Sequence, residues 1–140
     1  MNAVEPVGLV RLDDTDLVLA RSEDDVRGVT VTDSGGEEIG KVSSLFVDAE
    51  ERRVRLVEVA SGGLLGLGKE HRLIPVDAIV DVTEEKVVVG RTRDEIAEAP
   101  GYDPDLKEAQ PPQYYDELYG YYGMSPFWSA GYRSPNYPFR

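Results

Sequence analysis

The sequence predicts an all-β protein, either a small antiparallel barrel or a sandwich. Short runs rich in β-branched residues recur roughly every ten residues between Gly28 and Gly90. Clusters of Gly, Asp, Ser, Thr and Glu separate these runs and are typical of tight turns. A capped helical pattern follows the last run, after Arg91.

Residues 1–25 predict an N-terminal arm that packs on the barrel, because the stretch from Leu9 to Ala20 is apolar at both ends. The barrel itself begins near Val26. The run Gly28 to Thr32 predicts a first strand, which ends in the turn cluster Asp33 to Gly36.

Two of the predicted strands change phase along their length. In the strand from Ile39 to Val47, apolar residues point in both phases, and in the strand from Arg53 to Ala60 the phase switches after Leu56. A phase switch indicates a β-bulge or strong coiling, as small barrels need.

The remaining strands lie between Ser61 and Gly90. A glycine-rich loop leads into a strand from His71 to Val76, and Pro75 places that strand at an edge of the sheet. Residues 77–90 predict a hairpin with a tight turn at 83–86. A short helix follows, capped by Thr92 with Glu95 at the capping-box position.

Residues 105–140 are rich in Tyr, Pro and Gly, and predict a largely disordered tail with one helical turn near Tyr115 at most. Aromatic anchors of this kind suit protein interfaces. The candidate interaction residues are Tyr114, Tyr115, Tyr119, Tyr121, Tyr122 and Trp128. Three interpretations stay open: binding of a partner, self-association, or packing on the protein's own barrel.

Composition excludes several functions. The net charge of −12 argues against binding to nucleic acid or to an anionic membrane surface. Cysteine is absent, which removes disulfides and thiolate chemistry and suits the cytoplasm. No apolar run approaches the ~20 residues of a membrane span, so no stable membrane insertion is expected.

Five segments together resemble the PRC-barrel family, which includes the cytoplasmic domain of the photosynthetic reaction-centre H subunit and the C-terminal domain of the ribosome maturation factor. They are Asp24-Asp25-Val26-Arg27-Gly28, Gly40-Lys41-Val42, Val47-Asp48, Arg55-Leu56-Val57-Glu58-Val59 and Leu73-Ile74-Pro75-Val76. The resemblance covers Leu12 to about Pro104. It implies a six-stranded antiparallel PRC-type barrel with a closing helix, over residues 26–104.

The same resemblance gives roles to a few residues. Asp25, Arg27 and Gly28 match the Asp-x-Arg-Gly start of the first H-subunit strand, where Arg27 would brace a carboxylate such as Asp25 or Glu58 and Gly28 would admit the chain into the barrel. Glu58 and Asp48 are the carboxylates to compare with those that help protons reach the quinone in reaction centres.

No catalytic, cofactor or metal site is predicted. The run from Gly63 to Lys69 has the spelling of a P-loop, but Glu70 replaces the required hydroxyl and a strand follows. His71 is the only histidine, so a surface position or a pH-sensitive contact is expected. The acidic residues around the arm are expected to form a solvated face, with weak cation binding as the alternative.

The family consists mostly of binding modules, so the resemblance implies a non-catalytic protein-interaction module with an unknown protein partner. The alternatives are an H-subunit-like role in electron or proton transfer, or an adaptor role in ribosome assembly. A barrel of roughly 65 residues has a marginal core. It should therefore need its arm, its closing helix or a second copy, which makes a homodimer plausible.

Overall fold

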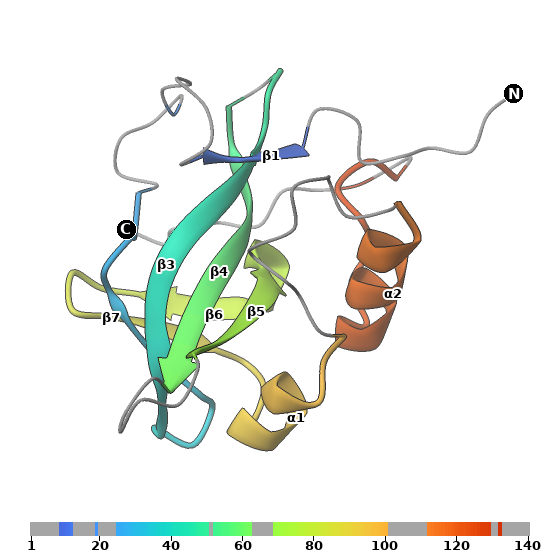
Figure 1. The fold of residues 1–140 in the computed structure, drawn as a ribbon. Helices are drawn as coiled ribbons and strands as arrows, with labels where there is room; N and C mark the ends of the chain where they lie inside the picture. Colours follow the sequence, from blue (N-terminus) through green and yellow to red (C-terminus); the bar gives the residue numbers. More distant parts are fainter. Residues whose placement is uncertain are drawn as a thin grey trace, which may run out of the picture.

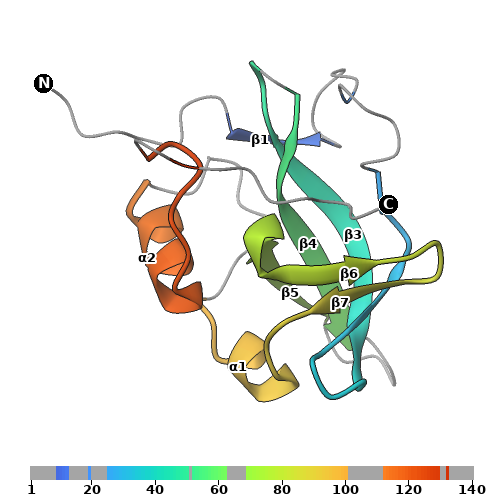
Figure 2. The same ribbon diagram turned by 180° about the vertical axis from the view of Figure 1, so that it is seen from behind.

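The computed structural model describes residues 9–12, 19, 25–50, 52–62, 69–100, 112–129 and 132. They form a curled sheet with two short α-helices on one side (Figures 1 and 2). The strands are β1 (Leu9–Arg11), β2 (Thr30–Thr32), β3 (Glu38–Asp48), β4 (Val54–Gly62), β5 (Lys69–Pro75), β6 (Ile79–Val82) and β7 (Lys86–Val89). The helices are the 3-10 turn η4 (Val76–Ala78), α1 (Arg93–Ala97) and α2 (Pro112–Tyr122).

Six strands follow one another in the order β5-β4-β3-β2-β7-β6, and β1 pairs with the C-terminal end of β3. All pairs are antiparallel except β2 with β7, which is parallel, with Val31 opposite Val87. The prediction of a six-stranded, wholly antiparallel barrel is therefore wrong in this detail. The turn η4 redirects the chain after β5, so the last hairpin crosses over β4 and β5 and meets β2 (Figure 2).

The predicted bulges occur in β3 and β4. The register between these strands shifts between Val42 and Ser44, and again opposite the step from Val54 to Leu56. The first shift leaves Ser43 outside the paired ladder and the second leaves Arg55 outside it. The second irregularity lies just before Leu56, whereas the phase switch placed it after that residue.

The interior of the sheet is aliphatic, as the scarcity of aromatic residues before the tail requires. Fully buried side chains include Val31, Leu45, Leu56, Leu73 and Ile74. Strand β5 lies at one end of the strand order, which confirms the edge position predicted from Pro75.

The helix after β7 begins as predicted. Thr92 caps α1, its hydroxyl accepting from the amide of Glu95, while the Glu95 carboxylate accepts from the amide of Thr92. The predicted hairpin turn also forms, with the Thr83 amide donating to the carbonyl of Lys86 at 2.8 Å.

The prediction of a largely disordered tail is wrong for residues 112–122, which form the helix α2. Its buried residues, Tyr114, Tyr115, Leu118, Tyr119 and Tyr122, recur at helical spacing along one face. Gly123, at a φ of 69°, ends the helix in a Schellman motif, in which the amide of Met124 donates to the carbonyl of Tyr119. The high Tyr, Pro and Gly content of the tail predicted disorder, although this helical spacing is present in the sequence. Residues 105–111, 130–131 and 133–140 of the tail lie outside the described part.

Candidate functional site

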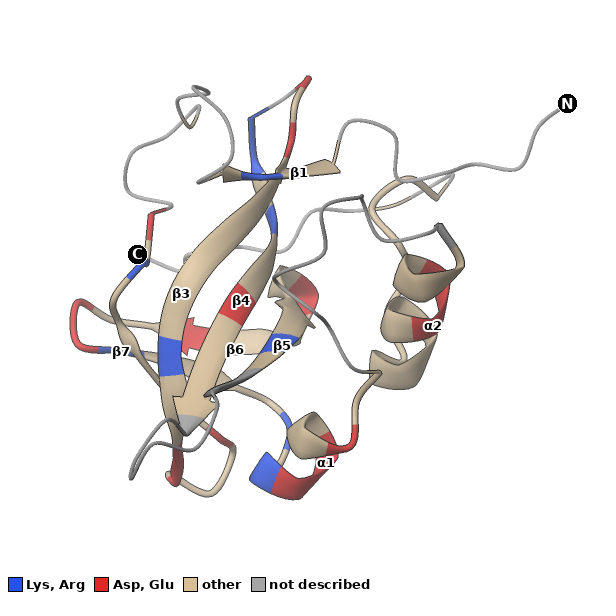
Figure 3. Ribbon diagram, viewed as in Figure 1, with Lys and Arg blue, Asp and Glu red and all other residues tan. Residues whose placement is uncertain are grey.

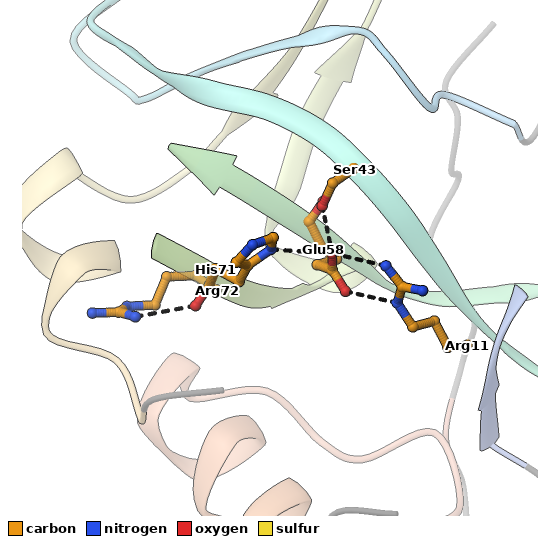
Figure 4. Close-up of polar contacts among 5 residues, drawn as sticks. All are labelled: Arg11, Ser43, Glu58, His71 and Arg72. Atoms are coloured by element: carbon orange, nitrogen blue, oxygen red, sulfur yellow. Dashed lines mark hydrogen bonds and ion pairs between the residues drawn. The ribbon is translucent and has the colours of Figure 1, made fainter. Parts of the chain in front are cut away.

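A buried carboxylate, Glu58, lies on β4, between β3 and β5, and gathers side chains from three other strands (Figure 4). Arg11 of β1 donates from Nε to Oε1 at 3.0 Å, and Ser43 of β3 donates to Oε2 at 2.5 Å. The Nδ1 atom of His71, on β5, lies 3.2 Å from Oε2. Glu58 thus joins β1, β3 and β5 to the strand that carries it.

The β3 bulge explains how Ser43 reaches Glu58. Since Ser43 stands outside the ladder and Ser44 pairs with Glu58, the Ser43 hydroxyl turns toward both the carbonyl and the carboxylate of Glu58. Burial alone would raise the pKa of Glu58, but the hydrogen bonds from Arg11 and Ser43, with the nearby charges of Arg11 and His71, outweigh it and lower the pKa. The carboxylate is therefore ionised at neutral pH.

A second buried pair joins the sheet to the C-terminal segment. Arg55 donates from Nε to Oδ2 of Asp48 at 2.7 Å, and both residues are about 5% exposed. The guanidinium also lies 5.0 Å from the ring centre of Phe127 and 5.9 Å from that of Tyr132. Arg55 is the residue that the β4 bulge leaves outside the ladder.

Close to this pair, the Tyr132 hydroxyl donates to Oδ2 of Asp77 at 2.9 Å. Burial raises the pKa of Asp77 above its ordinary value, although the Tyr132 hydrogen bond and the charge of Arg55 act in the opposite direction. The pKa of Tyr119 is raised well above its ordinary value by burial and by the charge of Asp77.

Arg27 was expected to bind a carboxylate such as Asp25 or Glu58, and in the structure it binds Asp25. Arg27 binds Asp25 with both Nε, at 2.9 Å, and a terminal nitrogen, at 2.7 Å, on the surface. The arginine that holds Glu58 is Arg11. Gly28 adopts a φ of 86° and donates from its amide to the carbonyl of Val42 at 2.8 Å, which fixes the chain where it enters the sheet.

Among the predicted aromatic residues, Tyr114, Tyr115, Tyr119 and Tyr122 are buried in the structure's own core. Tyr121 is 42% exposed, and its hydroxyl donates to the carbonyl of Glu95. Of the three interpretations of the tail, packing on its own barrel is the one that these contacts show.

Trp128 follows α2 and is half-buried. Its ring packs edge-to-face on Tyr119, with centres 5.4 Å apart, and on Phe127, with centres 5.1 Å apart.

Sequence reasoning missed Arg11, Ser43, Arg55 and Asp77 as site residues. The phase breaks in β3 and β4 were the signal for Ser43 and Arg55, because a residue in a bulge is the one whose side chain is redirected. Nothing in the pattern indicated that Tyr132 would reach Asp77, 55 positions away.

The other sequence candidates are placed only in part. His71 is half-buried, with its Nδ1 atom 3.2 Å from Oε2 of Glu58. The P-loop-like residues 63–68, and the acidic residues at 13–16 and 23–24, lie outside the described part. Within the described part, no three His, Asp or Glu side chains are grouped as a metal site would require.

None of the helices in the described ranges is long and apolar enough to cross a membrane. The family model for the PRC-barrel domain matches residues 20–96, which is more than half of the chain. No curated protein matches the sequence.

Proposed function

Because this chain belongs to the PRC-barrel family, we propose that it is a non-catalytic module that binds another protein. The observation that carries the proposal is that the buried charged side chains pair with one another inside the barrel. Glu58 is held by Arg11 and Ser43, and Asp48 by Arg55. These ionic groups brace the barrel, and this leaves the molecular surface as the place where the protein acts.

The charge of that surface favours a particular class of partner. Acidic residues lie on α1, beside Arg93, on α2 and on the β6–β7 turn (Figure 3), and the chain carries a net charge of −12. Such a surface attracts a cationic protein surface and accelerates association at low salt. We therefore expect a partner with a basic patch, and binding that weakens as ionic strength rises.

The proposed function can be tested by affinity capture of partners from native lysate, at about 0.05 M and about 0.5 M salt. Binding of each captured protein is then measured with purified components by calorimetry. The proposal requires one partner bound in a fixed ratio and more weakly at high salt. Replacing Glu84 and Glu85 with Gln gives a surface-charge control. Absence of any stoichiometric partner, or conversion of a small molecule by the purified protein, would contradict it.

A second copy of the chain is the first partner to examine, since the small core is expected to need the arm, the closing helix or a second copy. Light scattering after size exclusion, over a hundredfold range of concentration, gives the mass directly. A monomer at every concentration would remove the homodimer and leave a different protein as the partner.

The two other roles suggested by family resemblance have weaker support. A proton carrier for a quinone should titrate near neutral pH and reach solvent, whereas Glu58 is fully buried with a lowered pKa. An adaptor in ribosome assembly would have to meet RNA or basic ribosomal proteins, and the negative charge favours only the proteins.

A further inference from the structure

The segment from Pro112 to Tyr132, which we call the aromatic strap, covers one edge of the barrel. In both ribbon views α2 stands beyond β5, which is the last strand at that end of the sheet (Figures 1 and 2). An uncovered edge strand presents unpaired backbone groups that can pair with another chain. The strap therefore occupies a place where a partner would find a docking surface.

Polar contacts join the strap to the barrel at the two ends of α2 and again at Tyr132. Arg91 donates to the Tyr122 carbonyl at 2.5 Å, where a cation suits the C-terminus of a helix. Tyr114 donates to the carbonyl of Pro100 at 3.4 Å, and Tyr121 to that of Glu95. Beyond α2, Tyr132 binds Asp77, and rings of the strap lie against Arg55.

The fit between strap and barrel is incomplete. The hydroxyls of Tyr119 and Tyr122 and the Oδ1 atom of Asp77 are buried without a hydrogen-bond partner among the described residues. A buried polar atom without a partner loses its hydrogen bonds to water and forms none within the protein, which weakens the docking of the strap. These atoms make up most of the buried unpartnered side-chain atoms in the described part.

The helix of the strap also depends on the barrel to form. It has 11 residues, contains Gly120 and several tyrosines, and is shorter than helices that persist alone in water. If the strap leaves the barrel, α2 should therefore unfold, and the surface beneath it becomes available.

We propose that the strap is an internal pseudo-ligand, and that the surface beneath it, formed by Arg55, Asp77 and the β5 edge, is the docking site for a partner segment of the same kind, a tyrosine-bearing helix followed by aromatic residues. This inference rests on the proposed function and adds the chemistry of the partner and its regulation. The strap and the partner compete for the site, so the protein is autoinhibited until the strap is displaced.

The site beneath the strap is organised for such a ligand. The Asp48 carboxylate holds Arg55 in place, which presents a fixed cation to an aromatic ring. Asp77 offers a carboxylate to a phenol hydroxyl, and only one of its two oxygens is used by Tyr132. A partner that also satisfies the second oxygen would bind more tightly than the strap does.

The test uses the full-length protein with a weakened strap, Phe127→Ala with Tyr132→Phe, and a fluorescein-labelled peptide with the sequence of residues 112–132 as the probe. Hydrogen exchange should show faster exchange of the α2 amides in this variant, with the β4 amides unchanged. Fluorescence anisotropy should then show the peptide binding at least tenfold more tightly to the variant than to the wild type.

Two further variants map the site. Asp77→Ala in the weakened background should reduce peptide binding at least fivefold, because the acceptor for the tyrosine hydroxyl is gone. Glu84→Gln, on the β6–β7 turn at the opposite side of the molecule from α2 (Figure 1), should leave it unchanged. Equal peptide binding by the two variants would place the peptide elsewhere and overturn the proposal.

Other outcomes also overturn the inference: no peptide binding to the weakened variant, equal binding to the wild type, or α2 and β4 amides that exchange together. Its failure is separable from that of the proposed function. A lysate partner bound equally by the wild type and the weakened variant would support an interaction module without autoinhibition. Absence of any lysate partner would leave the peptide result intact.

Discussion

Glu58 shows at the scale of one residue how this protein uses charge inside its sheet. The side chain has no exposed surface, and strands β1 and β3 supply hydrogen bonds to it. Breaking a buried ion pair from one side leaves the other charge uncompensated, which costs more than the intact pair contributes. Arg11, whose side chain is about a quarter exposed, is the cation that would lose this carboxylate.

Replacing Glu58 with Gln is expected to lower the free energy of unfolding by about 3 kcal/mol at pH 7. The pKa of Glu58 is lowered on folding, so its stabilisation is present above its ordinary value of 4.5 and is lost as the pH falls through the folded pKa. The variant should therefore lose less stability than the wild type between neutral and acid pH. Urea unfolding from pH 7 to pH 3 measures both effects, with Glu85→Gln as the exposed control; equal slopes would contradict the assignment.

Asp77 should show the opposite pH dependence. Its folded pKa is raised, chiefly by burial, so its contribution to stability is greatest below the ordinary value of 3.8 and is lost as the pH rises through the folded pKa. Asp77→Asn keeps an acceptor for Tyr132 and removes the buried charge. We expect the variant to be more stable than the wild type at pH 7 and the difference to shrink toward pH 4. Thermal unfolding measures this, and a variant that is less stable at pH 7 would show that the charge is needed beside Arg55.

At the scale of the elements, α1 depends on its first turn. Thr92→Ala removes the hydroxyl that accepts from the Glu95 amide and should cost about 1 kcal/mol. Thr92→Ser keeps the acceptor and should restore most of this loss. Chemical unfolding of the three proteins tests the cap; an alanine variant as stable as the serine one would mean that the cap contributes nothing.

The strands and α2 should differ in local stability. Strand β4 is paired on both sides and buried along most of its length, whereas α2 docks with unpaired tyrosine hydroxyls. We expect the amides of α2 to exchange at least tenfold faster than those of β4 under native conditions. Hydrogen exchange read by mass spectrometry compares the two segments in the wild type, with the central residues of β3 as an internal standard.

For the whole molecule, net charge sets the response to salt. With a charge of −12, like charges repel one another, and raising the salt from about 0.01 M to about 0.1 M shortens the screening length from roughly 30 Å to roughly 10 Å. The melting temperature should rise by a few degrees over this range. Near pH 4, where about half of the carboxylates are protonated, the rise should vanish. A melting temperature that falls with salt at pH 7 would mean that attractive ion pairs dominate.

Local chemistry made several elements predictable from the sequence. The capping box at Thr92 and Glu95, the turn at 83–86 and the edge position of β5 each depend on residues within a few positions of one another. The bulges left a trace as well, because a phase switch is visible in the order of apolar residues. The spacing of Tyr114, Leu118 and Tyr122 can likewise be read from the order of residues and is helical, although the Tyr, Pro and Gly content suggested disorder.

The sequence by itself determined a small β-rich domain of the PRC-barrel family, its aliphatic interior and the absence of cysteine chemistry. Only the tertiary structure decided that β2 and β7 run parallel, that Arg11 is the partner of Glu58, and that the aromatic segment closes over Arg55 and Asp77. The physical reason is distance along the chain. Propensities and caps act within a few residues, whereas these contacts join positions up to 77 apart, as Arg55 and Tyr132 are, and depend on how the whole sheet curls.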